Sequence, residues 1–417
     1  MEKNNKLKIF ISAYACEPNL GSEIGVGWHW VLQMSQYFEL WVLTRKSNKA
    51  TIEAWLAKNP SYKNIYFIYF DLPYYLRFWK KGMRGVRIYY NIWQWTTNSI
   101  VKRTMQGHNI EIFHHLTYGN ALWSLSSYGK KQFFVWGPTG GGEIIPSEFT
   151  KHYKLKGRLI EILRRAVVKS LKYNVGFKSR CKHANLILCK TENHRKIIPV
   201  EFRDKAILFT DVAVDSIGFE AYREREVNNI VKYIVVGKLD PWRGFDLLIE
   251  AFEIAVKTNP NIHLTIVGKG MDWSRLYNLI QEKNLSKHIE MAGKVSMDSY
   301  YKLMKETDVV LNPSLKEGAV TTSFDSMALG KPLICIDTTG YTRYFSNEYA
   351  IVLPLQKRAV LIIALKDAII KLTNAKERAN LGGNAQAIGK QFTWDARGVE
   401  IQEVIKKWFN SKQSDIL

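Results

Sequence analysis

The segment Lys316-Glu-Gly-Ala-Val-Thr-Thr-Ser-Phe-Asp-Ser-Met-Ala-Leu-Gly-Lys-Pro-Leu-Ile334 combines a loop, a short helix and the start of a strand. Residues 320–329 have a helical pattern, and Gly330 is a typical helix end. Glu317 precedes this helix and Asp325 lies about two turns inside it, so two carboxylates flank a helix N-terminus. Amides there suit a diphosphate and carboxylates suit hydroxyls, which fits a sugar–diphosphate–ribose ligand. Alternatively, Glu317 caps the helix and Asp325 is solvated.

Short apolar runs and amphipathic stretches alternate along the chain, a pattern typical of parallel, doubly wound α/β sheets. In the first half we expect strands at Ile9–Ala13, Leu40–Thr44, Ile65–Tyr69, Ile112–His115, Phe133–Gly137 and Leu186–Cys189, with helices at Trp28–Tyr37 and Leu159–Lys172. The pattern then restarts. In the second half we expect strands at Tyr233–Gly237, His263–Gly268, Ile289–Ala292, Val309–Asn312 and Leu333–Asp337, with helices at Phe245–Lys257 and Met271–Glu282.

A polar and charged segment at about residues 210–230 separates the two series, and we place the linker there. We therefore expect residues 1–213 and 214–393 to form two Rossmann-like domains, because 417 residues exceed the usual size of one core. The helical run 394–417 is expected to return to the first domain as a closing helix. The fold class is α/β, with two facing doubly wound domains and a cleft at the carboxyl edges of their sheets.

Three further stretches follow expected strands of the second half. They are Val235-Val-Gly-Lys-Leu-Asp-Pro-Trp-Arg-Gly-Phe-Asp-Leu-Leu-Ile-Glu-Ala-Phe252, Val267-Gly-Lys-Gly270 and Asp337-Thr-Thr-Gly340. The first resembles the Gly-Arg-Leu…Lys-Gly-x-Asp-x-Leu-Ile element of glycosyltransferase family 4, and the second resembles its Val-Gly-x-Gly loop. Residues 316–334 resemble the Glu-x7-Glu motif of the same family. This resemblance, which runs the whole length of the chain, implies the GT-B fold of retaining glycosyltransferases.

The resemblance also implies roles for single residues in a C-terminal, donor-binding domain (214–393). Glu317 would bind hydroxyls of the transferred sugar, and Asp325, one methylene shorter than the family's Glu, would bind the ribose. Lys238 and Arg243 would hold the diphosphate, with Lys and Arg exchanged relative to the common form; the structural alternative is two surface cations around a proline turn. The remaining donor contacts are expected at Gly237, Gly268, Gly318, Ala319, Val320, Thr321 and Gly340.

Two glycine-rich stretches of the N-terminal half are assigned to the acceptor side. Glu17-Pro-Asn-Leu-Gly-Ser-Glu-Ile-Gly-Val-Gly-Trp28 resembles the first loop of one branch of the family, with candidate contacts at Gly21, Ser22 and Glu23. Trp136-Gly-Pro-Thr-Gly-Gly-Gly-Glu143 resembles the same branch and offers Gly140, Gly141 and Glu143. Glycines let a backbone approach a ligand closely. The alternative is a plain turn plus the start of a helix for the first stretch, and an unusual hairpin-like turn for the second.

His114 and His115 end an expected strand, where many family members place a histidine that contacts the transferred sugar. Strand alternation lets only one of them face the cleft. We favour His115, because it is nearer the end of the strand. With Glu317, these two histidines are the candidate catalytic residues; the alternative for them is a structural role.

The net charge of +22 is concentrated in residues 1–200, which hold 31 of the 60 Lys and Arg but 11 of the 38 Asp and Glu. This predicts an anionic partner, either nucleic acid or a membrane surface. Lys151–Lys182 carries eleven Lys or Arg and one acid, Glu161. One side of this segment is apolar, at Leu159, Ile162, Leu163, Ala166 and Val167. The pattern is typical of helices on anionic lipid, and the alternative is a core-facing helix with a solvated basic face.

A second basic stretch, Arg77–Arg87, is followed by aromatic residues, at Tyr89, Tyr90, Trp93 and Trp95. Such residues form belts at membrane interfaces, although they could also stack on bases. Because no recognised nucleic-acid motif accompanies them, we expect an anionic membrane surface and no nucleic acid as partner.

The sequence contains no apolar run of about 18 residues or more, no signal peptide and no paired cysteine framework. These features predict a cytoplasmic protein, peripheral at the inner face of the plasma membrane. The sequence has no Asp-x-Asp triplet, so we expect side chains and helix amides to stabilise the leaving group without metal or cofactor.

The resemblance implies metal-independent, retaining transfer of a hexose from a nucleotide-sugar to an acceptor, most simply a lipid-linked saccharide in surface polysaccharide biosynthesis. Two alternatives remain. One is a nucleotide-sugar 2-epimerase of the same fold, which would act without an acceptor. The other is a non-catalytic nucleotide- or nucleic-acid-binding protein.

Overall fold

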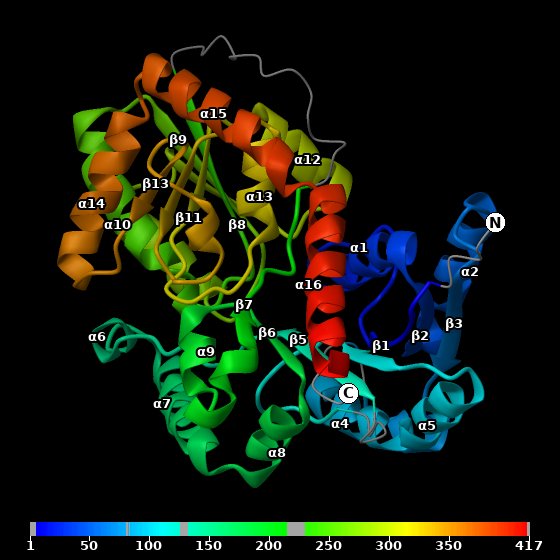
Figure 1. Ribbon diagram of the computed structural model, residues 1–417. Helices are drawn as coiled ribbons and strands as arrows, with labels where there is room; N and C mark the ends of the chain where they lie inside the picture. The colour runs from blue at the N-terminus through cyan, green and yellow to red at the C-terminus, as the bar shows by residue number, and fades with distance from the viewer. Residues whose placement is uncertain (1–5, 81, 83, 126–131, 215–229, 415–417) are drawn as a thin grey trace. The chain divides into compact units, whose positions relative to one another are not determined.

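The computed structural model of the chain describes residues 6–80, 82, 84–125, 132–214 and 230–414. These residues form two compact units, each built around its own sheet (Figure 1). Unit 1 comprises Met1–Gly142, Ser170–Asp211 and Trp394–Leu417, and unit 2 comprises Glu143–Lys169 and Val212–Thr393. Most of the expected linker, residues 215–229, lies outside the described residues.

Unit 1 contains a seven-stranded parallel sheet in the order β3-β2-β1-β4-β5-β6-β7. The strands are β1 (Lys8–Ser12), β2 (Glu39–Arg45), β3 (Ile65–Phe70), β4 (Ile112–His115), β5 (Phe133–Thr139), β6 (Leu186–Cys189) and β7 (Ala206–Leu208). The described helices are α1 (Ser22–Tyr37), α2 (Lys49–Lys58), α3 (Tyr74–Arg77), α4 (Val86–Thr96), α5 (Asn98–Gly107), α8 (Val175–His183), α9 (Glu192–Ile197) and α16 (Trp394–Ser414). Residues of α1 and α16 share one apolar cluster with the strands, and residues of α4, α5 and α8 share another. The strands are apolar runs because helices cover both faces of the sheet.

Unit 2 contains a six-stranded parallel sheet in the order β10-β9-β8-β11-β12-β13. The strands are β8 (Val231–Val236), β9 (Ile262–Val267), β10 (Ile289–Gly293), β11 (Val309–Asn312), β12 (Leu333–Ile336) and β13 (Ala350–Leu353). The helices are α6 (Ser147–Thr150), α7 (Leu155–Ser170), α10 (Phe245–Thr258), α11 (Trp273–Glu282), α12 (Met297–Glu306), α13 (Thr321–Ala328), α14 (Arg358–Lys371) and α15 (Ala375–Gly389). Apolar residues of α10, α11 and α14 pack with the strands in one core.

The predicted strands are all present, and three of them have the predicted bounds, namely Ile112–His115, Leu186–Cys189 and Val309–Asn312. Strands β7 and β13 were not predicted from the sequence. Each has only three or four residues and lies at the edge of its sheet. Short edge strands are partly exposed and carry a weak apolar signal, which explains the omission.

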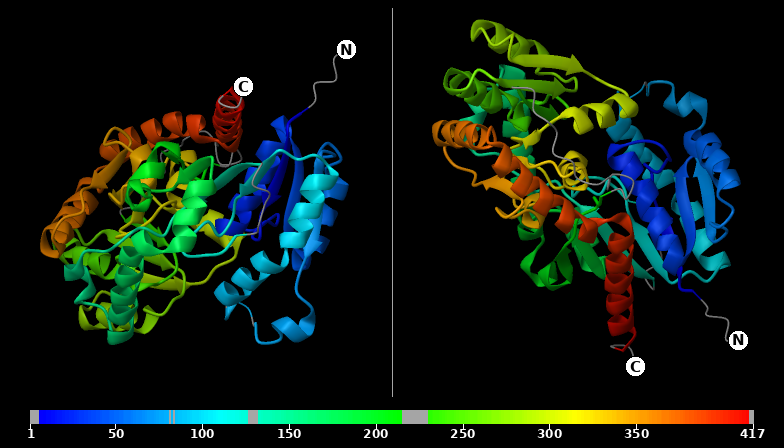
Figure 2. Two further views of the ribbon diagram at one scale, coloured as in Figure 1. Left: turned by 60° about the horizontal axis from the view of Figure 1, so that its bottom comes forward. Right: turned by 90° about the horizontal axis from the view of Figure 1, so that it is seen from above.

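The predicted division of the chain differs from the two units at residues 143–169 and, by two residues, at the boundary near Val212. The sequence analysis places residues 143–169 in the first domain, but Ile145 and Phe149 pack into the core of unit 2. The segment from Trp394 lies in unit 1, where the Trp394 ring stacks on His29 with centroids 5.1 Å apart. In Figures 1 and 2, α16 (red) accordingly lies beside α1 (blue).

Candidate active site

The carboxyl ends of β8 and β11 form the switch point of the second sheet. These strands are neighbours, yet the chain leaves β8 toward β9 on one side and β11 toward β12 on the other. Ligands of open α/β sheets bind where the strand order reverses, because the loops diverge there. The loop after β8 carries Lys238 and Arg243, and the loop after β11 carries Glu317.

Arg243 and Glu317 meet at the switch point. The Nη1 atom of Arg243 lies 2.5 Å from Oε1 of Glu317, and their side chains are 21% and 11% exposed. Gly244 permits this approach, since its φ is +70° and a Cβ there would lie 2.1 Å from the carbonyl oxygen of Pro313. The sequence places these two residues in separate motifs, and the fold brings them together as one ion pair.

The segment after Glu317 turns into α13, whose N-cap is Val320 without a side-chain cap. Glu317 therefore lies three residues before the N-cap position. The Thr338 hydroxyl donates to the carbonyl oxygen of Glu317 at 2.9 Å, which ties the loop after β12 to the same place. Gly340 lies two residues beyond Thr338 in that loop. The turn and the first helical residue are Gly318, Ala319, Val320 and Thr321.

Asp325 is the fifth residue of α13, so it lies nearer the N-terminus than the predicted two turns. It is buried and accepts a hydrogen bond from the Tyr300 hydroxyl of α12 at 2.5 Å. The proposal that Asp325 is solvated is therefore wrong. Burial, and then the charge of Asp325, raise the pKa of Tyr300 well above its usual value, so the phenol remains a donor. Tyr300, which lies 25 residues earlier in the chain, was not among the predicted donor residues.

Lys238 is more exposed than Arg243. Its side chain is 69% exposed, and its Nζ lies 3.1 Å from Oδ2 of Asp240. Two predicted donor glycines, Gly237 and Gly268, are in close backbone contact. Gly268 has a φ of +138°, and a Cβ there would lie 1.9 Å from the carbonyl oxygen of Gly237. The loops after β8 and β9 therefore touch through backbone, which only glycine allows at position 268.

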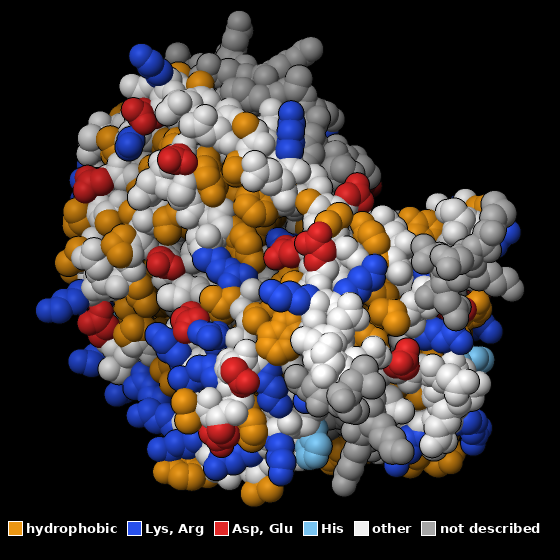
Figure 3. All heavy atoms as spheres, in the orientation of Figure 1, with side chains coloured by type: hydrophobic (Ala, Val, Ile, Leu, Met, Phe, Trp, Pro, Cys, Tyr) orange, Lys and Arg blue, Asp and Glu red, His pale blue; other side chains and the backbone are white. Residues whose placement is uncertain are grey.

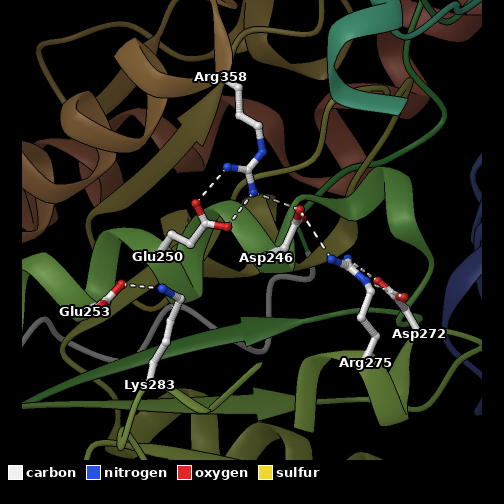
Figure 4. Close-up of polar contacts among 7 residues, drawn as sticks. All are labelled: Asp246, Glu250, Glu253, Asp272, Arg275, Lys283 and Arg358. Atoms are coloured by element: carbon white, nitrogen blue, oxygen red, sulfur yellow. Dashed lines mark hydrogen bonds and ion pairs between the residues drawn. The ribbon is translucent and has the colours of Figure 1, made fainter. Parts of the chain in front are cut away.

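A buried ionic network fixes the helix that follows Arg243. Asp246, in the first turn of α10, is 3% exposed. Arg275 of α11 and Arg358 of α14 both pair with its Oδ2 atom, at 3.6 and 3.1 Å (Figure 4). Arg358 also donates to both oxygens of Glu250 at 2.7 Å. The network joins α10 to α11 and α14 and so holds the turn that carries Arg243. Asp246 was not among the predicted site residues, although it belongs to the Gly-x-Asp part of the motif at residues 244–246.

His114 and His115 are both buried in unit 1, on opposite faces of β4. Nε2 of His114 donates to the carbonyl oxygen of Gly137 at 2.7 Å, and Nε2 of His115 lies 3.0 Å from the Tyr90 hydroxyl. Burial lowers the pKa of His114 to about 4 and that of His115 to about 3. Both rings are therefore neutral at pH 7. Which of them contacts a sugar stays a prediction.

The loop after β1 leads into α1 through the residues that the sequence analysis selected. Gly21 is the N-cap of α1 and Ser22 its first residue, with a φ of +58°. The Glu23 carboxylate accepts from the amide of Tyr118 at 2.6 Å. Glu23 thereby ties this loop to the loop after β4 at the carboxyl edge of the first sheet.

The glycine-rich loop after β5 lies against the same edge. The amide of Gly140 donates to the carbonyl oxygen of Gly119 at 3.0 Å. Gly141 has a φ of +108°, and a Cβ there would lie 2.8 Å from Nδ2 of Asn120. The loops after β1, β4 and β5 therefore adjoin one another in unit 1.

Glu143 follows this loop and pairs with α7. It belongs to unit 2, is 8% exposed, and its Oε2 lies 3.6 Å from Nη2 of Arg164 in α7. Nε of Arg164 also donates to the carbonyl oxygen of Glu143 at 3.3 Å. Whether Glu143 contacts an acceptor stays a prediction.

The aromatic belt predicted after Arg87 is wrong for three of its four residues. Tyr89, Tyr90 and Trp93 are buried in the core of unit 1, and Trp95 is exposed. Their spacing follows the period of α4, so they form its core-facing side. Three other exposed aromatic residues near this basic stretch lie on and beside α3, at Tyr74, Tyr75 and Phe78.

The predicted apolar side of α7 is not a core face. Leu159, Ile162, Leu163 and Ala166 are exposed and Val167 is half-buried. The alternative of a core-facing helix with a solvated basic face is therefore wrong. The residues of α7 that are buried are Gly157, Glu161 and Val168.

Within the residues that the structure describes, no three His, Cys, Asp or Glu side chains gather as a metal site. No described helix has the length and apolar character needed to cross a bilayer. Each cysteine is a buried free thiol, at Cys16, Cys181, Cys189 and Cys335.

Residues 220–387 match the model of the family described as glycosyl transferases group 1. An uncharacterized glycosyltransferase of Methanocaldococcus jannaschii is 24% identical over 339 residues, which cover 80% of this chain and 80% of that protein. The structure of Anabaena Alr3699/HepE in complex with UDP and glucose has a TM-score of 0.59 at 14% identity, covering 96% of this chain and 100% of that chain. The structure of WaaG, a glycosyltransferase involved in lipopolysaccharide biosynthesis, has a TM-score of 0.59 at 13% identity. The similarity covers 95% of this chain and 99% of WaaG.

The family match contains the donor residues predicted from the sequence, including Arg243, Glu317 and Asp325. The similarity to solved structures extends over nearly the whole chain and shows the fold. Residues 220–387 therefore form a glycosyltransferase group 1 domain, and the chain as a whole has the GT-B fold.

Proposed function

We propose that this protein transfers a hexose from a nucleotide-diphosphate sugar to a saccharide acceptor, with retention at the anomeric carbon. The observation that carries the proposal is the Arg243–Glu317 pair at the switch point of a group 1 domain. It sets a cation suited to phosphate and a carboxylate suited to hydroxyls beside the start of α13.

Each donor residue has a role in this proposal. The planar guanidinium of Arg243 binds phosphate oxygens in pairs and stabilises the charge that develops on the leaving diphosphate. Lys238 supplies a second cation. Glu317 accepts hydrogen bonds from hydroxyls of the sugar, and Asp325, held by Tyr300, accepts from the ribose. The acceptor oxygen bonds to the anomeric carbon while the bond to the diphosphate breaks, and the leaving phosphate takes the acceptor proton.

Because Arg243, Lys238 and the amides of α13 carry the leaving-group charge in this scheme, transfer should need no metal ion. We expect the rate in excess EDTA to stay within about twofold of the untreated rate, since the loss of one electrostatic stabiliser costs about 100-fold or more. The measurement is release of nucleoside diphosphate with and without EDTA, with readdition of Mg²⁺ and Mn²⁺ as the control. A rate abolished by EDTA and restored by either cation contradicts the metal-independent scheme.

Tyr300→Phe should weaken the binding of a nucleoside diphosphate about tenfold, because a hydrogen bond to a charged group contributes about 1.5 kcal/mol or more. Its loss leaves the buried Asp325 carboxylate less firmly oriented toward the ribose. Calorimetric titration measures the change, and Tyr301→Phe, a half-exposed neighbour, is the matched control. Equal affinity of the two variants would show that Asp325 makes no ribose contact.

For the acceptor, we propose a lipid-linked saccharide of a surface polysaccharide, used at the inner face of the plasma membrane. Support comes from the basic first half of the chain and from the exposed apolar side of α7. The similar fold of WaaG, which acts in lipopolysaccharide biosynthesis, agrees with an acceptor of this class. The saccharide would bind at the loops of unit 1 that carry Glu23 and Gly141, near the end of β4 where His115 lies.

Thermal unfolding in the presence of UDP-, GDP-, ADP- and TDP-sugars tests the donor class. A ligand at about 100 times its Kd stabilises the folded state by about 2.7 kcal/mol, which raises the midpoint by several degrees. We expect one nucleotide series to stabilise the protein, and the parent protein then to consume that donor only with an acceptor present. Interconversion of the free donor to its 2-epimer would instead establish the epimerase alternative.

A further inference from the structure

Helix α7 directs its apolar residues away from unit 2. Its buried residues, Gly157, Glu161 and Val168, are spaced by four and seven and share one side of the helix. The opposite side is exposed, with Leu155 and Leu163 at 73% and 66%. That outward stripe consists of Leu155, Leu159, Ile162, Leu163 and Ala166. The usual arrangement, in which the apolar side faces the core, is therefore inverted.

Cations border the outward stripe. Lys156 lies along one edge of the stripe, and Arg158 and Lys169 lie along the other edge. All three side chains are exposed. In Figure 3, Lys and Arg side chains gather around apolar ones at the lower left, where Figure 1 places α7. An apolar stripe between cationic edges is complementary to a bilayer with anionic headgroups and apolar chains. The outward stripe therefore suits an anionic lipid surface.

The inward side of α7 contacts the two donor loops. A Cβ on Gly157 would lie 3.2 Å from Cγ of Pro241, which begins the turn ending at Arg243. Glu161 accepts from Nζ of Lys316 at 2.5 Å, and Lys316 immediately precedes Glu317. One helix thus combines a lipid-type surface with direct contacts to the segments that hold both donor side chains.

Lys316 links Glu161 of α7 to Trp242, which lies beside Arg243 in the loop after β8. The side chains of Lys316 and Glu161 are both 8% exposed. Burial lowers the pKa of Lys316 to about 8, whereas the nearby Glu161 carboxylate favours the charged form of Lys316. The Lys316 ammonium lies 5.1 Å from the ring centroid of Trp242, and the Arg243 guanidinium lies 4.6 Å from it. Displacement of α7 would therefore break a buried ion pair and shift the cation that packs on Trp242 beside Arg243.

We propose that α7 binds an anionic bilayer through its outward stripe, and that this binding steadies the donor loops through the Glu161–Lys316 pair. Glu161 is then a positioning residue, and the inference rests on the donor site of the proposed function. Bilayer-bound protein should hold the nucleoside diphosphate about fivefold or more tightly than free protein, a typical coupling between two sites. By reciprocity, the nucleotide should strengthen vesicle binding by the same factor.

The experiment measures two quantities on the full chain. The first is cosedimentation with 3:1 vesicles of phosphatidylcholine and phosphatidylglycerol at about 0.05 M salt. The second is the Kd of UDP, with GDP in parallel, in the presence and absence of those vesicles. Leu159→Ser/Leu163→Ser alters the outward stripe, and Glu161→Gln alters the inward contact. Val360→Ser/Ile363→Ser, two exposed apolar residues of α14, is the matched control. Because Glu161→Gln leaves Lys316 buried without its charge partner, Glu161→Gln/Lys316→Met serves as a second inward variant.

The stripe variant should lose vesicle binding about tenfold or more and show no vesicle effect on UDP, while its Kd without vesicles stays unchanged. The inward variants should still sediment but lose the vesicle effect on UDP and the UDP effect on sedimentation. The control should match the parent protein. The inference is overturned if the stripe variant sediments normally, if vesicles leave the parent Kd unchanged, or if dilution shows that the stripe instead joins two copies of the chain. Vesicle binding without any binding of UDP, GDP, ADP or TDP would overturn the proposed function and the coupling, and leave the lipid surface standing.

Discussion

Glu317→Gln is expected to lower kcat/KM for transfer about 100- to 1,000-fold. The carboxylate lies at the switch point with Oε1 2.5 Å from Arg243, where the proposed donor sugar would bind. An amide is nearly isosteric but forms weaker hydrogen bonds with hydroxyls and cannot neutralise the guanidinium. Misplacement of a reacting sugar by about 1 Å can cost about 100-fold in rate. The measurement is initial velocity with the donor identified by thermal stabilisation.

Glu282→Gln, an exposed carboxylate at the end of α11, is the control and should retain the parental rate. Circular dichroism and the thermal midpoint should show that Glu317→Gln remains folded, since Glu317 lies in a loop and the amide is nearly the same size as the carboxylate. A folded Glu317→Gln protein with near-parental velocity would remove Glu317 from the proposed site.

Arg243→Met should reduce kcat/KM about 100- to 1,000-fold, because loss of one preorganised stabiliser of developing charge costs about 2.7–4 kcal/mol. The kcat/KM of Arg243→Lys should lie between that of Arg243→Met and that of the parent protein, since an ammonium keeps the charge but lacks the planar geometry that binds two oxygens. Donor KM and kcat should both change, because the phosphate is bound in the ground state and gains charge in the transition state.

Lys287→Met, an exposed cation before β10, is the matched control for charge loss and should behave as the parent. The order of activities, parent above Arg243→Lys above Arg243→Met, is the specific expectation. Equal activity of the two Arg243 variants would contradict bidentate phosphate binding, and parental activity of both would exclude Arg243 from the donor site.

The fold was predictable from sequence because parallel strands buried on both faces are continuous apolar runs. The strand Val309–Asn312 shows this, since all four of its residues are buried. The closeness of Arg243 and Glu317 was also predictable in part. Both follow strands of one sheet, and only the strand order β9-β8-β11-β12 was needed to bring their loops together.

Contacts between distant, unremarkable residues were not predictable. Tyr300 and Asp325 lie on different helices 25 residues apart, and Glu161 and Lys316 are 155 residues apart. No local pattern distinguishes a tyrosine or a glutamate that will find such a partner, because the pairing depends on how helices pack on the sheet. This limit also explains why residues 143–169 were assigned to the wrong unit.

The sequence also did not predict whether the apolar side of an amphipathic helix faces the protein core or the solvent. The aromatic residues of α4 and the aliphatic residues of α7 both follow helical spacing beside basic residues. In the structure Tyr90 is fully buried, whereas Leu163 is 66% exposed. Periodicity identifies an apolar side and leaves open whether protein or lipid covers it.

Calorimetric titration of the parent protein, Arg243→Met and Glu317→Gln with the nucleoside diphosphate of the identified donor tests the central claim most directly. Because Arg243 is assigned to phosphate and Glu317 to the sugar, Arg243→Met should lose about 10- to 100-fold in affinity, as expected for a charge-assisted hydrogen bond worth about 1.5–3 kcal/mol. Glu317→Gln should bind the diphosphate within about threefold of the parent. Parental affinity in Arg243→Met would contradict the assignment of the β8 and β11 loops as the site of donor binding.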